Sequence, residues 1–203
     1  PALPIKTLFH PIYNDLPKKL DKSIAREKLR IPTSAKNVVL FFGLIRPYKG
    51  LEVLIEASNF LSEQTHIIIA GECYGSWKKY ARLIHESKAK ARIHIVNRFI
   101  PDEQLGDFFA AADLVALPYL SASQSGVTAT AIQYNLPIVA SNVGDLSNSI
   151  TEGETGALVK AGDSHALAEA IDMWFLEKHP ELGESYAKLK ATKSWEAFAK
   201  KLV

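Results

Sequence analysis

The sequence has only one cysteine, little net charge and no long apolar run. Cys73 stands alone among the 203 residues, which excludes an internal disulfide and a cluster of metal-binding thiols and favours a cytoplasmic setting. The net charge of +2 is too small to indicate a nucleic-acid partner. No apolar run approaches the roughly 18 residues that a membrane span requires. An ordinary globular domain is therefore expected.

An initiator methionine and a signal-peptide pattern are also missing. The chain begins Pro1-Ala2-Leu3-Pro4, and we expect it to continue from a longer protein. Hydrophobic residues make up 47% and charged residues 23% of the chain, which are ordinary values for a globular fold. A length of 203 residues suits one domain, alone or with a small appendage.

Short apolar runs recur along the chain at intervals of roughly 20–30 residues, the length of a strand plus a crossover helix. The runs lack polar alternation, as expected for strands that are covered on both faces. Amphipathic stretches lie between them. This pattern predicts an α/β fold, a doubly wound parallel sheet of Rossmann type, over residues 38–179. The predicted strands are residues 38–42, 67–70, 93–96, 114–117 and 138–140.

Two segments flank this predicted domain. Residues 1–37 are rich in proline and are expected to form an interdomain linker that leads into a short helix near residues 23–29. Residues 180–203 are expected to form one or two terminal helices. Within the domain, Asp163 is the predicted N-cap of the clearest amphipathic helix, which includes Leu167 and Trp174.

In such a sheet, ligands bind at the carboxyl ends of the strands, where the strand order reverses. The loop after the first strand runs from Gly43 to Gly50 and contains Arg46 and Lys49. Two cations ahead of a helix suit an anion, and a surface turn with two solvated cations is the alternative. The loop is not a Walker A motif. No Gly-x-Gly-x-x-Gly follows the strand either, which disfavours a dinucleotide oxidoreductase.

The loop after the fourth strand is small, hydroxylated and contains a glycine. The amides of Ser125, Gly126 and Val127 open a helix predicted over residues 127–134 and would point at a phosphate. The hydroxyls of Ser123 and Ser125 add donors. An ordinary N-capped helix is the alternative. Because both loops lie at one edge of the predicted sheet, together they favour a diphosphate.

Several short motifs follow one another in order along most of the chain. They are Phe42-Gly43-Leu44-Ile45-Arg46-Pro47-Tyr48-Lys49-Gly50-Leu51, Ile100-Pro101-Asp102-Glu103, Ala112-Asp113-Leu114, Leu117-Pro118-Tyr119, Ser123-Gln124-Ser125-Gly126, Leu136-Pro137-Ile138-Val139-Ala140-Ser141 and Gly153-Glu154-Thr155-Gly156. In this order and at this spacing, they resemble glycosyltransferase family 4 (group 1). Enzymes of that family have two Rossmann-like halves in a GT-B arrangement, and this chain resembles the carboxyl-terminal, donor-binding half.

The resemblance implies a mechanism and a set of site residues. The donor would be a UDP- or GDP-sugar, and a hexosyl group would be transferred with retention and without a required metal. Lys49, with Arg46, would stabilise the charge on the leaving diphosphate in place of Mg²⁺. The amides of residues 125–127, together with Gly43 and the hydroxyls of Ser123 and Ser125, would share that charge. Main-chain groups of Arg98 and Ile100 would contact the nucleobase.

The resemblance also implies partners that lie outside this chain. The acceptor, a saccharide or a lipid-linked saccharide, would be held by an amino-terminal half that is missing here. A peripheral contact with the inner face of a membrane would also be made through that half. Assembly of a polysaccharide is the implied process, on family analogy alone.

The sequence departs from the family at the site. A pair of glutamates, one near the sugar and one at the ribose hydroxyls, falls here on Ala122 and Thr130. Thr130 would give the ribose one hydrogen bond, which is weaker than that of a carboxylate. The arginine that usually follows the glycine is replaced by Leu44, so Arg46 must reach from a shifted position. A non-catalytic subunit that stabilises a partner enzyme is therefore the alternative.

Other polar residues receive simpler interpretations. Phe99 is expected in the core, with stacking on the base as the alternative. Glu72 would either face the donor sugar or cap a helix. The turn at residues 142–145 has the same two alternatives, contact with a sugar or the capping of a helix. Cys73 is expected to pack and His94 to be a satisfied strand histidine. No metal site is expected from the remaining histidines of the domain, His66, His85, His165 and His179.

Overall fold

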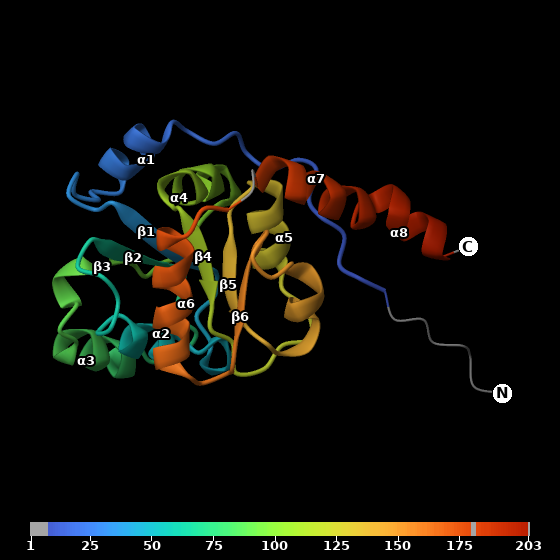
Figure 1. Ribbon diagram of the computed structural model, residues 1–203. Helices are drawn as coiled ribbons and strands as arrows, with labels where there is room; N and C mark the ends of the chain where they lie inside the picture. Colours follow the sequence, from blue (N-terminus) through green and yellow to red (C-terminus); the bar gives the residue numbers. More distant parts are fainter. Residues whose placement is uncertain (1–7, 180–181, 203) are drawn as a thin grey trace.

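The computed structural model (Figure 1) describes residues 8–179 and 182–202, and its centre is a six-stranded parallel sheet. The strand order is β3-β2-β1-β4-β5-β6, so that the order reverses between β1 and β4. This confirms the doubly wound, Rossmann-like sheet predicted from the sequence. The strands are β1 (Asn37–Phe42), β2 (Thr65–Ala70), β3 (Ile93–Val96), β4 (Leu114–Leu117), β5 (Ile138–Ser141) and β6 (Gly156–Val159).

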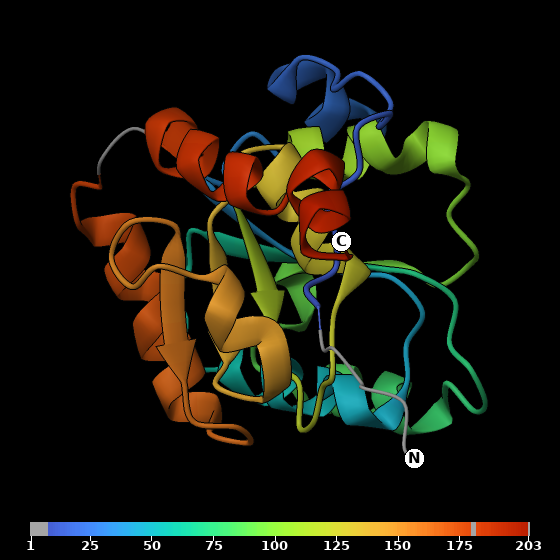
Figure 2. The same cartoon turned by 90° about the vertical axis from the view of Figure 1, so that its right-hand side faces the viewer.

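Helices cover both faces of the sheet (Figures 1 and 2), and alternate residues of each strand supply the two cores. In β1, Val38 and Leu40 face one core, whereas Val39 and Phe41 face the other. This two-sided burial explains the unbroken apolar runs in the sequence. The first core is covered by α1 (Lys22–Lys28), α4 (Leu105–Ala111), α5 (Gly126–Gln133) and α7 (Leu182–Thr192), and the second by α2 (Leu51–Ala57), α3 (Lys78–Glu86) and α6 (Ser164–Leu176).

Strand β6 is absent from the sequence-based prediction, because its first residue is a glycine that follows a turn-like sequence. A side chain on Gly156 would place its Cβ 1.8 Å from the carbonyl oxygen of Ile138 in β5. The close approach of the two backbones therefore requires glycine. β6 pairs in parallel with β5, from Ile138 opposite Gly156 to Ser141 opposite Val159.

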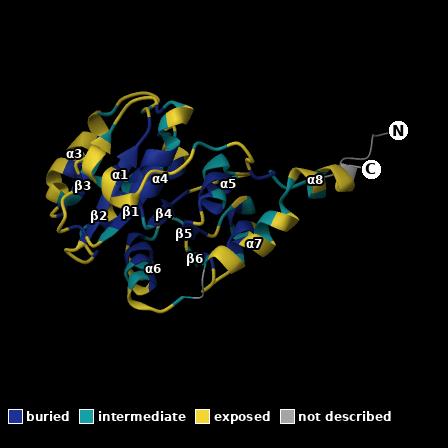
Figure 3. Ribbon diagram, turned by 90° about the horizontal axis from the view of Figure 1, so that it is seen from above, coloured by how far each residue is buried: buried dark blue, intermediate teal, exposed yellow. Residues whose placement is uncertain are grey.

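The carboxyl-terminal helices extend the fold beyond the sheet. The predicted cap of α6 is confirmed, because the Asp163 carboxylate accepts a hydrogen bond of 2.9 Å from the amide of Ala166. After α7 comes α8 (Trp195–Leu202), which projects away from the buried strands in the view from above (Figure 3). Tyr186 fixes α7 by donating to the carbonyl of Leu136 at 2.5 Å. None of the helices in residues 8–179 and 182–202 is long and apolar enough to cross a membrane.

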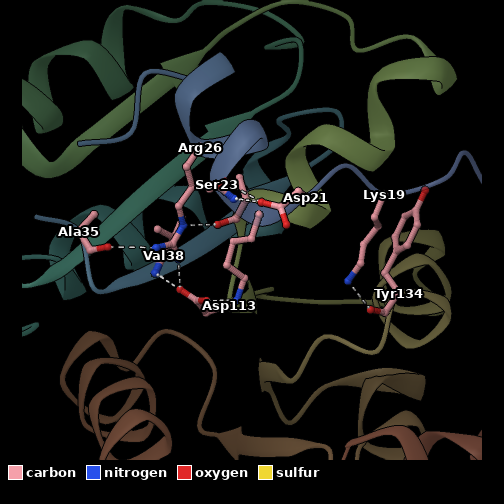
Figure 4. A network of polar contacts seen from close by, with 10 residues as sticks. Lys19, Asp21, Ser23, Arg26, Ala35, Val38, Asp113 and Tyr134 are labelled. Atoms are coloured by element: carbon pink, nitrogen blue, oxygen red, sulfur yellow. Dashed lines mark hydrogen bonds and ion pairs between the residues drawn. The ribbon is translucent and has the colours of Figure 1, made fainter. Parts of the chain in front are cut away.

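The leading segment, which we define as residues 8–21, and α1 are held to the sheet by a polar network (Figure 4). The Arg26 guanidinium donates to the carbonyls of Ala111 and Ala35 and to the carboxylate of Asp113, at 3.0, 3.1 and 2.5 Å. Asp113 also accepts from the amide of Val38 at the start of β1. Nearer the amino terminus, Lys19 donates to the carbonyl at the end of α5. Thus the segment before β1 packs against the domain.

Candidate functional site

A pocket of about 810 Å³ opens at the carboxyl ends of β1 and β4, where the strand order reverses. It is lined by residues 13–17 of the leading segment, by the β1–α2 loop, by the start of α4, by the β4–α5 loop and by Trp195 of α8. This is the position at which doubly wound sheets bind ligands.

The β1–α2 loop buries a lysine at the floor of this pocket. Lys49 is only 8% exposed, and within the described residues its ammonium has no hydrogen-bonded or ion-paired partner. Its Nζ lies 5.6 Å from the ring centroid of Tyr119. A Cβ on Gly43 would come within 3.1 Å of that nitrogen, so glycine makes room for the cation. Burial, and then the charge of Arg46, lower the pKa of Lys49 from 10.5 to about 8.

The β4–α5 loop contributes the amino terminus of α5. Ser125 caps the helix and accepts a hydrogen bond of 3.4 Å from the amide of Thr128. Within the described residues, the amides of Gly126 and Val127 donate to no backbone or side-chain acceptor. The Tyr119 hydroxyl lies 3.3 Å from Ser125 Oγ, and burial raises the pKa of Tyr119 to about 12. The buried ammonium and the free amides therefore line one pocket, as an anion requires.

A tight junction holds these two loops together. The amide of Leu120, just after β4, donates to the carbonyl of Tyr48 at 2.7 Å. Gly50 has a positive φ of 65°, and a Cβ there would lie 2.0 Å from the carbonyl oxygen of Pro118. Glycine is therefore required where the loops cross.

The sequence over residues 36–176 matches the family described as "Glycosyl transferases group 1". The chain belongs to the group 1 glycosyltransferases. Among curated proteins, this glycosyltransferase chain is 33% identical over 189 residues to a D-inositol 3-phosphate glycosyltransferase of Corynebacterium urealyticum. The match covers 88% of the chain and 44% of that relative, so the chain spans less than half of the relative's length.

Solved structures show the same fold. Sucrose-phosphate synthase from Thermosynechococcus elongatus has a TM-score of 0.76 at 26% identity, covering 96% of this chain and 48% of that one. The Anabaena protein HepE, crystallised with UDP-glucose, has a TM-score of 0.75 at 23% identity, covering 90% of this chain and 52% of its own. The glycosyltransferase chain thus has the fold of a GT-B half-domain.

Most of the site residues predicted from the sequence meet in the pocket of this glycosyltransferase. Arg46 does not line it, because its guanidinium lies 4.3 Å from the ring centroid of Tyr74. Ser123 also lies outside the lining, and its carbonyl accepts from the amide of Asp145. The predicted residues that line the pocket are Gly43, Lys49, Ser125, Gly126, Val127 and Thr130.

The segment predicted to contact a nucleobase lies outside the lining as well. Arg98 donates to the carbonyl of Phe99 and to Gln104 Oε1, at 3.0 and 2.7 Å. Ile100 is buried in the core. The expectation that Phe99 is a core residue is wrong, because its side chain is 68% exposed. In this loop between β3 and α4, residues 97–99 are exposed and Ile100 is the residue that turns into the core.

Ala122 and Thr130, where the resemblance led us to expect glutamates, offer no carboxylate. The Thr130 hydroxyl is buried and donates to the carbonyl of Gly126 at 3.0 Å, within α5. Ala122 lies against the turn after β5, since a Cβ on Gly144 would meet its carbonyl oxygen at 1.7 Å. That turn begins the 3₁₀ helix η4 (Gly144–Ser149).

The remaining polar residues lie elsewhere. His94, as predicted, is satisfied: its Nε2 lies 2.9 Å from His66 Nδ1, and burial lowers the pKa of both rings. Glu72 is exposed outside the pocket. The thiol of Cys73 is half-buried, and its pKa is raised by burial. In the part of the chain that the structure describes, no three potential metal ligands of the His, Cys, Asp or Glu type converge.

The leading segment and α8 also contribute to the pocket, and neither contribution was predicted from the sequence. Tyr13, Asp15 and Trp195 all line the pocket. In the sequence, these are simply aromatic and acidic residues within segments predicted to flank the domain, and nothing else marks them as pocket residues. Their approach to the strand ends is a tertiary contact, which local patterns do not contain.

Proposed function

We propose that this chain is the donor-binding half of a retaining glycosyltransferase that transfers a hexosyl group from a UDP- or GDP-sugar to a saccharide or a lipid-linked acceptor. The observation that carries this proposal is the buried Lys49 ammonium, which has no counter-ion in the described residues and shares its pocket with the free amides of α5. A buried unpaired cation is costly, and a bound diphosphate would supply the missing charge.

The chemistry follows from this arrangement. When the bond between the sugar and the diphosphate breaks, negative charge grows on the departing phosphate oxygens. Lys49 and the amides of Gly126 and Val127 would stabilise that charge from preset positions. Lys49 would thereby replace a divalent metal, so neither a metal nor another cofactor is required. Arg46 would contribute through its charge, because its side chain stacks on Tyr74 beyond the pocket wall.

The remaining parts of the reaction belong to a second half. The chain spans 44% of its curated relative and about half of the two solved structures, which fits an amino-terminal, acceptor-binding partner domain. HepE is a protein of this fold that binds UDP-glucose, which supports a nucleotide-sugar donor. The proposed setting is the cytoplasm, and any contact with a membrane face would be made by that second half.

A titration with nucleotides tests the donor site. We expect UDP or GDP to bind this chain by calorimetry, and EDTA to leave the affinity unchanged. Replacing Lys49 with Met should weaken binding by about tenfold or more, because a charge-assisted contact is lost. As a control, Lys78→Met removes an exposed cation of α3, and it should have no effect. Equal affinity of the wild type and Lys49→Met would refute the proposed diphosphate site.

The alternative, a non-catalytic subunit, is favoured by the lack of a carboxylate at Ala122 and Thr130. The two functions differ in turnover. The protein including its second half should hydrolyse or transfer sugar from the donor that binds, and Lys49→Met should abolish this. Tight binding of the nucleotide with no turnover of the nucleotide sugar would instead support the subunit.

A further inference from the structure

The leading segment, blue in Figure 1, passes close to α5 and contacts it at both ends. At the start of the helix, a Cβ on Gly126 would lie 3.0 Å from the Tyr13 hydroxyl. At its end, the hydroxyl of Tyr134 donates to the carbonyl of Pro17 at 2.6 Å. The leading segment therefore contacts α5 near its start through Tyr13 and just past its end through Pro17, and Asp15 lies midway between these two contacts along the chain.

Asp15 brings a free carboxylate to this position. Its side chain is exposed and lines the pocket, and within the described residues it has neither a hydrogen bond nor an ion pair. Thr130, in the second turn of α5, directs its hydroxyl to the carbonyl of Gly126. The second turn of α5 itself thus offers the pocket no carboxylate.

The position of Asp15 relative to Lys49 indicates what it would bind. The phosphate-binding groups, Lys49 and the first-turn amides, lie at one end of α5. The second turn is roughly 6 Å further along the helix axis. The apolar side chains of Leu16, Phe42 and Leu105 line the same pocket and suit a flat ring. The part of a nucleotide that lies between the diphosphate and the base is the ribose, which carries two hydroxyl groups.

We propose that Asp15 accepts hydrogen bonds from the ribose hydroxyls of the bound nucleoside diphosphate. This inference rests on the proposed donor-binding function. A carboxylate can accept from both hydroxyls, and such charge-assisted bonds are stronger than those of a neutral acceptor. The buried, unpaired Lys49 in the same pocket shows independently that the pocket is built for a ligand.

Asp102 provides a matched control. It begins the 3₁₀ helix η3 (Asp102–Gln104), lines the same pocket and is also exposed and unpaired among the described residues. Asp102→Asn therefore makes the same change of charge as Asp15→Asn, on a different segment. Both residues are solvent-exposed, so both variants should fold like the wild type, and their thermal unfolding midpoints check this.

The test compares three kinds of ligand by calorimetry: UDP and GDP, their 2′,3′-dideoxy analogues, and inorganic pyrophosphate. The wild type should bind the better nucleotide about tenfold more tightly than its dideoxy analogue. Asp15→Asn should bind the two about equally, with its affinity for pyrophosphate unchanged or higher because a negative charge is gone. Asp102→Asn should keep the wild-type preference.

The possible failures are distinct. In one outcome the nucleotide binds and Lys49→Met weakens that binding, yet Asp15→Asn still prefers the nucleotide to its dideoxy analogue. The role of Asp15 is then overturned and the donor site stands. If Asp102→Asn alone removes the preference, the carboxylate is Asp102 and the assignment to Asp15 is wrong. If neither UDP nor GDP binds, the donor site and this inference both fail.

Discussion

At the scale of single residues, Lys49 has two properties that oppose each other. Its burial without a partner in the described residues prepares an anion site, and the same burial disfavours its charged form. Residues selected for binding often reduce stability in this way. The amino-acid pattern could indicate a cation beside a strand end, but it could not separate Lys49 from Arg46. Only the packing around Gly43 and Tyr119 distinguishes the buried cation from the one that lies on Tyr74.

We expect Lys49→Met to stabilise the ligand-free protein at pH 7. The pKa of Lys49 falls from 10.5 to about 8 on folding, so the unfolded chain binds more protons between those pH values. The free energy of unfolding therefore rises with pH between about 8 and 10.5. Below pH 8, keeping the charged Lys49 buried costs the native protein on the order of 3 kcal/mol. Urea unfolding at pH 7 should show a gain of about 1–3 kcal/mol for the variant. The gain should shrink by pH 10.

A variant that is less stable than the wild type at pH 7 would contradict this account of Lys49. The outcome would mean that the ammonium has a favourable partner in solution. Lys78→Met again serves as the control, because an exposed lysine should show no difference between the two pH values.

At the scale of elements, the strands at the centre were predictable and the segments at the margins were not. Strands β3 and β4 have the predicted bounds, because unbroken apolar runs identify strands that are buried on both faces. β6 was missed because Gly156 makes its start resemble a turn. The position of α1 depends on Arg26, whose bonds to Ala111 and Asp113, more than 80 residues further along the chain, leave no local pattern.

We expect Arg26→Ala to destabilise the fold by about 2–4 kcal/mol, because two carbonyls lose a donor and Asp113 keeps only the exposed Lys22 of its two ion-pair partners. Urea unfolding measures the loss. Lys36→Ala, an exposed cation on the connection between α1 and β1, is the control and should change stability by less than about 0.5 kcal/mol. Similar values for the two variants would show that the network in Figure 4 contributes little.

At the scale of the whole molecule, the strand order decides where the site lies. β1 and β4 are neighbours in the sheet although more than 70 residues separate Phe42 from Leu117 along the chain. Both loops were predictable at one edge because parallel strands end together, and the pocket does contain residues of both. The junction between the loops, in contrast, depends on one close contact at Gly50 that no pattern predicts.

Gly50→Ala should therefore disrupt the site and the fold together. The new Cβ would require a shift of Pro118, at a backbone φ that alanine disfavours, with an expected cost of about 2 kcal/mol or more. UDP or GDP affinity should fall as Lys49 moves away from α5. Gly75→Ala is a close control, because Gly75 also has a positive φ, of 104°, but nothing lies within 4 Å of its added Cβ. Calorimetry and urea unfolding of both variants separate crowding from backbone strain.

The unpaired ammonium of Lys49 also has a practical consequence for work on this protein. A buried cation beside free helix amides, with no counter-ion among the described residues, accepts small oxyanions as well as nucleotides. Phosphate, sulfate and citrate in a buffer are thus expected to compete for it. Affinities measured in phosphate-buffered saline would understate nucleotide binding, and crystals grown from ammonium sulfate would carry sulfate beside α5.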